Sequence, residues 1–137
     1  MNISQHTIDI QFYYSNFSDL INWLYEVIKN EKVKPGELNI IFTSDLYLLT
    51  LNNQYLNHDY FTDVLSFDYS TDNVISGDIF ISIDRVKENS LTYNIDFYTE
   101  LDRVIVHGLL HLIGYNDSEL NERKIMQQKE IYYLQIR

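Results

Sequence analysis

Apolar and polar residues alternate over positions 6–14, in a stretch rich in β-branched and aromatic side chains. Such alternation predicts a β-strand, because successive side chains of a strand point to opposite faces. Residues 35–43 predict a turn followed by a second strand. Residues 64–69 and 77–83 predict two more strands, joined as an antiparallel hairpin by a longer polar loop at 70–76. The pattern therefore predicts about four strands.

A second pattern, in which apolar residues recur three and four positions apart, predicts helices. They cover residues 18–31, 44–56, 84–94, 96–113 and 119–135. Ser44 and Ser118 stand at expected N-caps, where a serine hydroxyl can accept a hydrogen bond from a free backbone N–H group. Gly114 follows the long apolar helix, and glycine readily adopts the left-handed conformation that ends a helix.

The order of these elements is βαβαββααα, without repeats or low-complexity segments. This order predicts an α/β fold with one small mixed sheet of about four strands and helices packed on it. The length of 137 residues fits one domain over residues 1–137, and a 45% hydrophobic content is enough for one core.

The stretch HGLLHLIGYND, residues 107–117, carries the clearest candidate chemistry. His107 and His111 are four positions apart, so a helix places both on one face, one turn from each other. Gly114 lets the chain bend back, and Asp117 can then supply a third ligand. Two imidazoles, a carboxylate and a water form one known kind of catalytic zinc site. We therefore predict that this helix near the C-terminus binds a metal ion through His107, His111 and Asp117.

The residue types available limit the reaction class. The chain has no cysteine, so any metal ion must be held by His, Asp or Glu. The spacing resembles the H-x-x-x-H-x-x-G-x-x-H/D layout of metzincin peptidases, which carry a glutamate general base directly after the first histidine. Gly108 holds that position here, so a peptidase would lack its proton acceptor. A hydrolase activated mainly by its metal is the better interpretation, and a zinc peptidase-like hydrolase is the weaker alternative.

Charge and hydropathy narrow the expected partners. The net charge of −10 argues against tight nonspecific binding to nucleic acid, but is compatible with a local basic surface or a ribonucleoprotein partner. No apolar run approaches the roughly 18–20 residues of a membrane span. The N-terminal residues lack the basic and apolar regions of a secretory signal. We expect a cytoplasmic protein without membrane association.

Two blocks of the sequence resemble the YbeY family of zinc-dependent endoribonucleases, which act in ribosomal RNA maturation. The block HGLLHLIGYND is similar to the family pattern H-G-x-L-H-L-x-G-Y-D-H, and LNNQYLNHDYFTDVLSF resembles L-N-x-x-Y-R-x-x-D-x-x-T-D-V-L-S-F. Shorter matches follow at GDIFIS and at Met126 and Glu130, which fit M-x-x-x-E. The resemblance covers about residues 38–134, and two separate blocks in order are far more specific than one short motif.

The resemblance implies a metal-dependent, single-strand-specific endoribonuclease with one Zn²⁺ per chain. It also implies a role in 16S 3′-end maturation and ribosome quality control. The partners would be ribosomal RNA and the ribosome or small-subunit proteins, with no DNA substrate. A ribosome-associated factor with a structural zinc and little nuclease activity is the alternative that remains open at this point.

The chain departs from the family pattern at two positions. Asp117 stands where the family usually has histidine, and aspartate is a competent zinc ligand. Leu56 stands where the family usually has an arginine that is thought to contact phosphate. His58, two residues on, is the nearest candidate substitute for substrate binding, against the simpler interpretation as a solvated loop histidine. Arg103 lies four residues before His107 on the same helix face and is the second candidate substrate-binding residue, against the simpler interpretation as an ion-pair partner of Glu100. The sequence identifies no catalytic general base.

Overall fold

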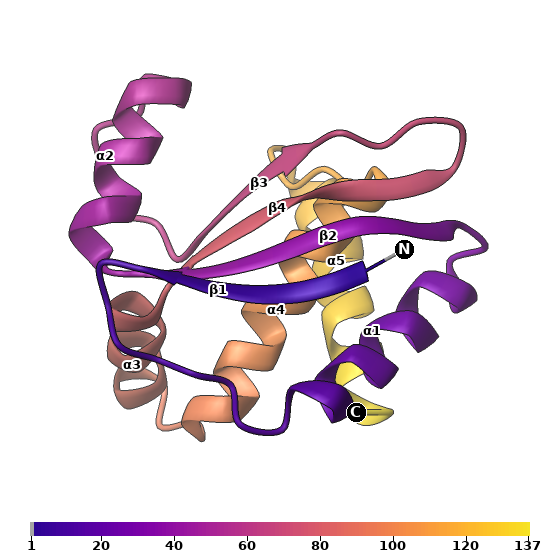
Figure 1. The fold of residues 1–137 in the computed structure, drawn as a ribbon, viewed down its shortest axis with the longest axis horizontal. Coiled ribbons are helices and arrows are strands. Elements are labelled where there is room, and N and C mark those ends of the chain that lie inside the picture. Colours follow the sequence, from indigo (N-terminus) through magenta and orange to yellow (C-terminus); the bar gives the residue numbers. More distant parts are fainter. Residues whose placement is uncertain (1) are drawn as a thin grey trace.

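The computed structural model describes residues 2–137, which form an α/β fold with a four-stranded mixed sheet and five helices (Figure 1). The elements in chain order are β1 (Asn2–Ile8), α1 (Phe17–Asn30), β2 (Lys34–Thr43), α2 (Asp45–Leu56), β3 (Val64–Asp68), β4 (Val74–Ser82), α3 (Ile83–Thr92), α4 (Phe97–Ile113) and α5 (Leu120–Gln135). The predicted fold class and the predicted order of elements are confirmed.

The sheet has the strand order β1-β2-β4-β3, with β1, β2 and β4 parallel and β3 antiparallel to β4. The predicted hairpin is confirmed, but the prediction of a long polar loop is wrong. β4 begins at Val74, and Asp72 and Asn73 occupy the turn with φ angles of 50° and 64°. Positive φ at two central residues gives the tight hairpin turn whose twist matches that of the flanking strands.

The first strand also differs from the prediction, because β1 covers Asn2–Ile8 rather than residues 6–14. Ile8 pairs with Thr43, the last residue of β2, so the neighbouring strand offers no further backbone partner. Asp9 then turns the chain with a φ of 60°. The alternating side chains beyond it lie in a loop, where Phe12 is partly buried against the core and Tyr14 is 3% exposed.

Helices cover the two faces of the sheet unequally. Figure 1 shows α1, α4 and α5 on one side of the sheet and α2 on the other. The main core lies on the first side and includes buried residues of α1, α4 and α5 together with one face of the sheet. A small second cluster, Leu48, Leu51 and Leu65, lies between α2 and the other face.

Gly108 allows α4 to pack directly on the hairpin. A Cβ atom at this position would lie 2.6 Å from Cγ2 of Ile79 and 3.1 Å from Oγ of Ser66. The hydroxyl of Ser66 donates a hydrogen bond to the carbonyl oxygen of Gly108 at 3.0 Å. Position 108 therefore faces the sheet, and no side chain there could reach a ligand bound beside His107.

The start of α5 lies one residue from the predicted cap. Glu119 rather than Ser118 is the N-cap, and the Glu122 carboxylate accepts hydrogen bonds from the Glu119 N–H at 3.0 Å and the Ser118 hydroxyl at 3.1 Å. Glutamate at the third helical position closes a capping box, which satisfies backbone N–H groups that a helix start leaves free.

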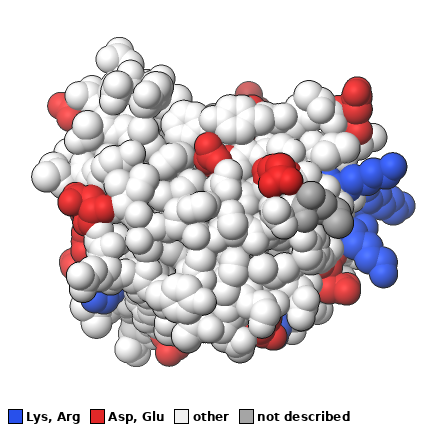
Figure 2. All heavy atoms as spheres, in the orientation of Figure 1, with Lys and Arg blue, Asp and Glu red and all other residues white. Residues whose placement is uncertain are grey.

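The surface is acidic without being uniform. Figure 2 shows carboxylates spread over the visible face, whereas the basic side chains on that face gather mainly at one edge. Within residues 2–137, no helix combines the length and the apolar character needed to cross a membrane.

Candidate metal centre

Helix α4 brings the two histidines together, as the spacing requires. The imidazoles of His107 and His111 lie with ring centroids 4.6 Å apart, and their Nε2 atoms are 3.1 Å apart. Both side chains are partly buried, with exposed fractions of 17% and 28%. One face of one helix therefore directs two ring nitrogens toward a single point.

The end of α4 returns the chain to the same point. Gly114 has a φ of 123°, and its N–H bonds back to the carbonyls of Leu110 and His111. This left-handed turn directs the next segment across the end of the helix. Oδ2 of Asp117 then lies 3.3 Å from Nε2 of His107 and 3.3 Å from Nε2 of His111. The structure thus places all three predicted metal ligands together, within 4.8 Å of one another.

The spacing of these three atoms suits a first-row metal ion. Zinc bonds of about 2.0–2.2 Å in a tetrahedral arrangement place neighbouring ligand atoms roughly 3.3 Å apart. The three observed separations are 3.1, 3.3 and 3.3 Å. Two imidazoles and one carboxylate also match the ligand chemistry of a site that keeps one position open. The residues present therefore fit a divalent metal ion.

The outer ring nitrogens of both histidines are already engaged. Nδ1 of His107 lies 2.5 Å from Oε2 of Glu130, and Nδ1 of His111 lies 2.9 Å from the carbonyl oxygen of Tyr115. These partners hold the proton on Nδ1 and leave each Nε2 lone pair directed at the metal position. In the sequence, Glu130 stood out only as part of the family pattern M-x-x-x-E. Tyr115 contacts His111 through its backbone carbonyl, and the identity of a side chain does not predict such a contact.

Glu130 also raises the pKa of the first histidine, His107. Its carboxylate comes from α5 and is buried, with an exposed fraction of 7%. Burial works to lower the pKa of His107, but the hydrogen bond and the charge of Glu130 outweigh it and raise this pKa. A carboxylate–histidine pair of this kind raises the basicity of a metal-ligating imidazole. The signal available in the sequence was a glutamate on the face of α5 that also carries Met126.

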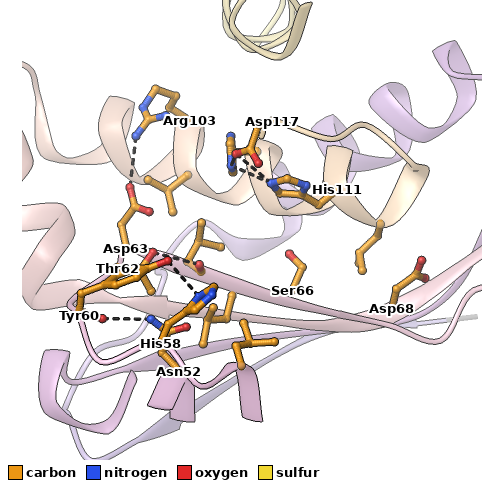
Figure 3. Close-up of a pocket in the computed structure, with 16 residues that line it drawn as sticks. Asn52, His58, Tyr60, Thr62, Asp63, Ser66, Asp68, Arg103, His111 and Asp117 are labelled. Atoms are coloured by element: carbon orange, nitrogen blue, oxygen red, sulfur yellow. Dashed lines mark hydrogen bonds and ion pairs between the residues drawn. The ribbon is translucent and has the colours of Figure 1, made fainter. Parts of the chain in front are cut away.

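A cavity of about 620 Å³ opens beside the candidate metal centre, and Figure 3 shows its lining. One wall is α4 with the segment that carries Asp117, and the other is β3 with the loop between α2 and β3. Its lining residues include Leu56, His58, Tyr60, Asp63, Ser66, Asp68 and Arg103. The cavity is open to solvent and large enough for a small polar ligand.

Arg103 lines this cavity, but carboxylates occupy its guanidinium. It makes two hydrogen bonds to Glu100 at 2.7 and 2.9 Å, one to Glu130 at 3.1 Å and one to Asp63 at 3.4 Å. The simpler interpretation, a partner for Glu100, describes the observed contacts. Arg103 thus connects α4 and α5 to the loop that leads into β3. Burial raises the pKa of the Asp63 carboxyl, although the positive charge of Arg103 acts to lower it.

The other candidate substrate-binding residue, His58, lies on the opposite wall. Figure 3 shows it across the cavity from His111 and Asp117. Its Nδ1 is 2.9 Å from the hydroxyl of Tyr60, and the two rings are nearly parallel. Leu56, at the position of the usual family arginine, also lines the cavity and is 44% exposed. The structure therefore groups an apolar and two aromatic side chains where a phosphate-binding arginine is usual.

The fold and the site define an α/β protein with a candidate two-histidine, one-carboxylate metal centre in an open cavity. The family model described as Endoribonuclease YbeY matches residues 2–136. The chain is 48% identical to Endoribonuclease YbeY of Karelsulcia muelleri, over 91% of this chain and 93% of the relative. It is also 48% identical to Endoribonuclease YbeY of Flavobacterium psychrophilum, over 89% and 87% of the two chains.

A solved structure shows the same fold. The solution structure of TM1509 from Thermotoga maritima aligns with a TM-score of 0.69 and 31% identity, over 98% of this chain and 87% of that one. The chain belongs to the endoribonuclease YbeY family, and the resemblance noted from its sequence blocks is confirmed.

Proposed function

We propose that the protein is a zinc-dependent, single-strand-specific endoribonuclease that acts in the cytoplasm in 16S 3′-end maturation and ribosome quality control. The observation that carries this proposal is the convergence of Nε2 of His107, Nε2 of His111 and Oδ2 of Asp117 at 3.1–3.3 Å, in an open cavity of a chain from this family. Ribosomal RNA, with the ribosome or its small-subunit proteins, is the proposed partner, and DNA is not expected as a substrate.

The chain's own residues would prepare the site in three ways. His107, His111 and Asp117 would hold one zinc ion, which supplies Lewis-acid polarisation and acidifies a water molecule when bound. Glu130 and the carbonyl of Tyr115 keep the Nδ1 protons in place, so both imidazoles present Nε2. The cavity admits an RNA phosphate beside these atoms. Attack by water and attack by the RNA 2′-hydroxyl are both compatible with this arrangement.

Two features favour this function over the alternatives. Structural zinc sites normally have four protein ligands, whereas three ligand atoms from residues 2–137 meet here beside an open cavity. That difference favours a catalytic over a structural metal. Position 108 faces the sheet, so it offers no room for the glutamate base of a zinc peptidase.

The direct test is cleavage by the purified, metal-analysed full chain. The wild-type protein should carry about one zinc per chain and cleave a single-stranded RNA while leaving duplex RNA and single-stranded DNA intact. Asp117→Ala should lose cleavage, and His6→Ala, a change in β1 outside the cavity lining, should not. Metal-loaded wild-type protein that leaves RNA uncut would contradict the proposal and favour a ribosome-associated factor.

A further inference from the structure

We propose that the loop between α2 and β3 holds an unpaired RNA base by stacking on Tyr60 and His58. On the cavity wall formed by this loop and β3, such stacking would take the place of a phosphate contact. This inference rests on the proposed function and deepens it by naming how the single strand is held. Its first support is the chemistry of the loop wall. Tyr60 is 55% exposed and Leu56 is 44% exposed, and both line the cavity that contains the candidate metal centre.

The charges around the cavity argue against phosphate binding on this wall. Among the described residues that line the cavity, Arg103 is the one lysine or arginine, and three carboxylates already surround its guanidinium. The lining also contains Asp63, Asp68 and Asp117. Among residues 2–137, no free cation lines this wall for a phosphate group to meet. An uncharged base avoids the repulsion that these carboxylates would exert on a phosphate.

The aromatic pair has the geometry of a stacking platform. The rings of His58 and Tyr60 have centroids 5.1 Å apart and an interplanar angle of 19°. The Tyr60 hydroxyl and Nδ1 of His58 are 2.9 Å apart and hold the pair in register. Every nucleobase has a flat π-face, so such a pair can bind single strands with little sequence preference.

The platform is anchored to α2. Asn57 ends the helix in a left-handed conformation with a φ of 56°. The buried side chain of Asn52 donates from Nδ2 to the Tyr60 carbonyl at 3.0 Å, and the Asn52 carbonyl accepts the His58 N–H at 3.2 Å. Both ring-bearing residues are therefore fixed to the same helix turn. Oδ1 of Asn52 is buried without a hydrogen-bond partner, which is uncommon and leaves an unused acceptor under the platform.

The position of the platform suits a strand that crosses the cavity. Figure 3 shows His58, Tyr60 and Asn52 on one side, and Arg103, His111 and Asp117 on the other. A base held on the loop side would leave its sugar–phosphate backbone within the cavity, toward the candidate metal centre. The cavity of about 620 Å³ is within the size range of small-ligand sites.

The test is the affinity of the full chain for a short, labelled, single-stranded oligonucleotide of 2′-O-methyl RNA, checked on a gel to remain uncut. Tyr60→Leu keeps an apolar side chain but removes the ring, and it should weaken binding by about 5- to 150-fold, the range seen for one stacked base. Tyr60→Phe keeps the ring but removes the hydroxyl that contacts His58, so it should bind more weakly than wild type and much more tightly than Tyr60→Leu. Tyr13→Leu, a change at a tyrosine that is 68% exposed and outside the cavity lining, is the matched control.

Two further measurements separate stacking from phosphate binding. Plots of log affinity against log salt should stay parallel for wild type and Tyr60→Leu, because stacking releases no counterions. An abasic oligonucleotide of the same length should bind wild type more weakly, and Tyr60→Leu should cause no additional loss with it. Equal affinities of Tyr60→Leu and Tyr13→Leu, or a changed salt slope, would overturn the stacking inference.

This outcome can be separated from failure of the proposed function. If wild type cleaves RNA but its binding is independent of Tyr60, the stacking inference alone is wrong. If binding depends on Tyr60 but metal-loaded wild type leaves RNA uncut, the inference stands and the nuclease proposal is wrong. Circular dichroism and thermal unfolding of each variant establish that a loss of binding is not a loss of fold.

Discussion

The two walls of the cavity are built in opposite ways. On the α4 wall, Nδ1 of His107 is held by Glu130, and Nδ1 of His111 is held by the Tyr115 carbonyl. On the loop wall, Leu56 and Tyr60 are 44% and 55% exposed. A metal ion tolerates little variation in ligand geometry, so its wall needs a rigid support. A flexible single strand can adapt to its wall, which needs exposed surface instead.

The supports of the α4 wall come from far along the chain. Glu130 lies on α5, while the hydroxyl of Tyr115 donates to Oε1 of Glu31 at 2.6 Å, just after α1. Lys129 also donates to Glu31 at 3.0 Å, and the Tyr133 hydroxyl makes a further short hydrogen bond to it. The segment between α4 and α5 is thus tied to both α1 and α5.

The largest effect should follow removal of a metal ligand. His107→Ala or His111→Ala should reduce zinc from about one per chain to near zero, because two remaining ligands bind zinc poorly. Elemental analysis of dialysed protein measures this content. His6→Ala is the control, since His6 lies on β1 and bonds to Ser4 rather than to the cavity. Full zinc content in both ligand variants would place the metal elsewhere.

Loss of the carboxylate behind His107 should weaken zinc binding without abolishing it. Glu130→Gln should lower zinc affinity by about 10- to 100-fold, the usual cost of changing a hydrogen-bond partner of a metal ligand. Competition with a chromophoric chelator measures the affinity. Glu88→Gln, at an exposed position on α3, is the matched control. Equal affinities of the two variants would show that Glu130 supports only the packing of α5.

A smaller loss is expected from the segment that carries the third ligand. Tyr115→Phe removes the hydroxyl that bonds to Glu31 but keeps the carbonyl that bonds to His111. Zinc affinity should fall by up to about tenfold, because the segment with Asp117 is held less firmly. The same chelator competition measures it, with Tyr13→Phe as the control. An unchanged affinity would mean that Gly114 and the backbone alone position Asp117.

The Glu31 cluster should also make folding stability depend on pH. Burial works to raise the pKa of Glu31, but hydrogen bonds from Tyr115, Tyr133 and Lys129 outweigh it and hold the pKa below its ordinary value of 4.5. A lowered pKa stabilises the fold above pH 4.5, and the contribution is lost as the pH falls through and below that value.

Urea unfolding at neutral and acidic pH measures this contribution. Glu31→Gln should be less stable than wild type at neutral pH, and the difference should shrink at about pH 3. Glu26→Gln, an exposed change on α1, should show no such convergence. A stability difference that stays constant with pH would show that the charge of Glu31 does not contribute.

The smallest effect is expected on the loop wall. Leu56→Arg should add one phosphate contact, because a guanidinium can bind a phosphate through two parallel hydrogen bonds. The salt dependence of RNA affinity should steepen by a slope of about 0.7. The gain should be modest, since Asp63 and Asp68 line the same cavity. Parallel salt curves with equal affinities would mean that position 56 does not reach phosphate.

Local pattern predicted more of the helices than of the strands. The sequence identified all five helices between residues 2 and 137. Helices α1 and α4 each bury a broad apolar face, whereas α2, α3 and α5 bury only two apolar residues each. The first strand was misplaced because alternation also occurs in a loop whose apolar side chains pack on the core, as at Phe12. Where a strand ends depends on its neighbour, and here β2 ends at Thr43.

The sequence by itself determined that His107, His111 and Asp117 could meet, because a four-residue spacing on a helix and a glycine turn are local properties. It also carried the family pattern. Only the tertiary structure decided that Glu130 and the Tyr115 carbonyl orient the two imidazoles. It also decided that carboxylates pair with the guanidinium of Arg103, and that Tyr60 faces the same cavity. Those contacts join α4 to α5, the hairpin and the α2–β3 loop, and no spacing along the chain encodes a distance between separate elements.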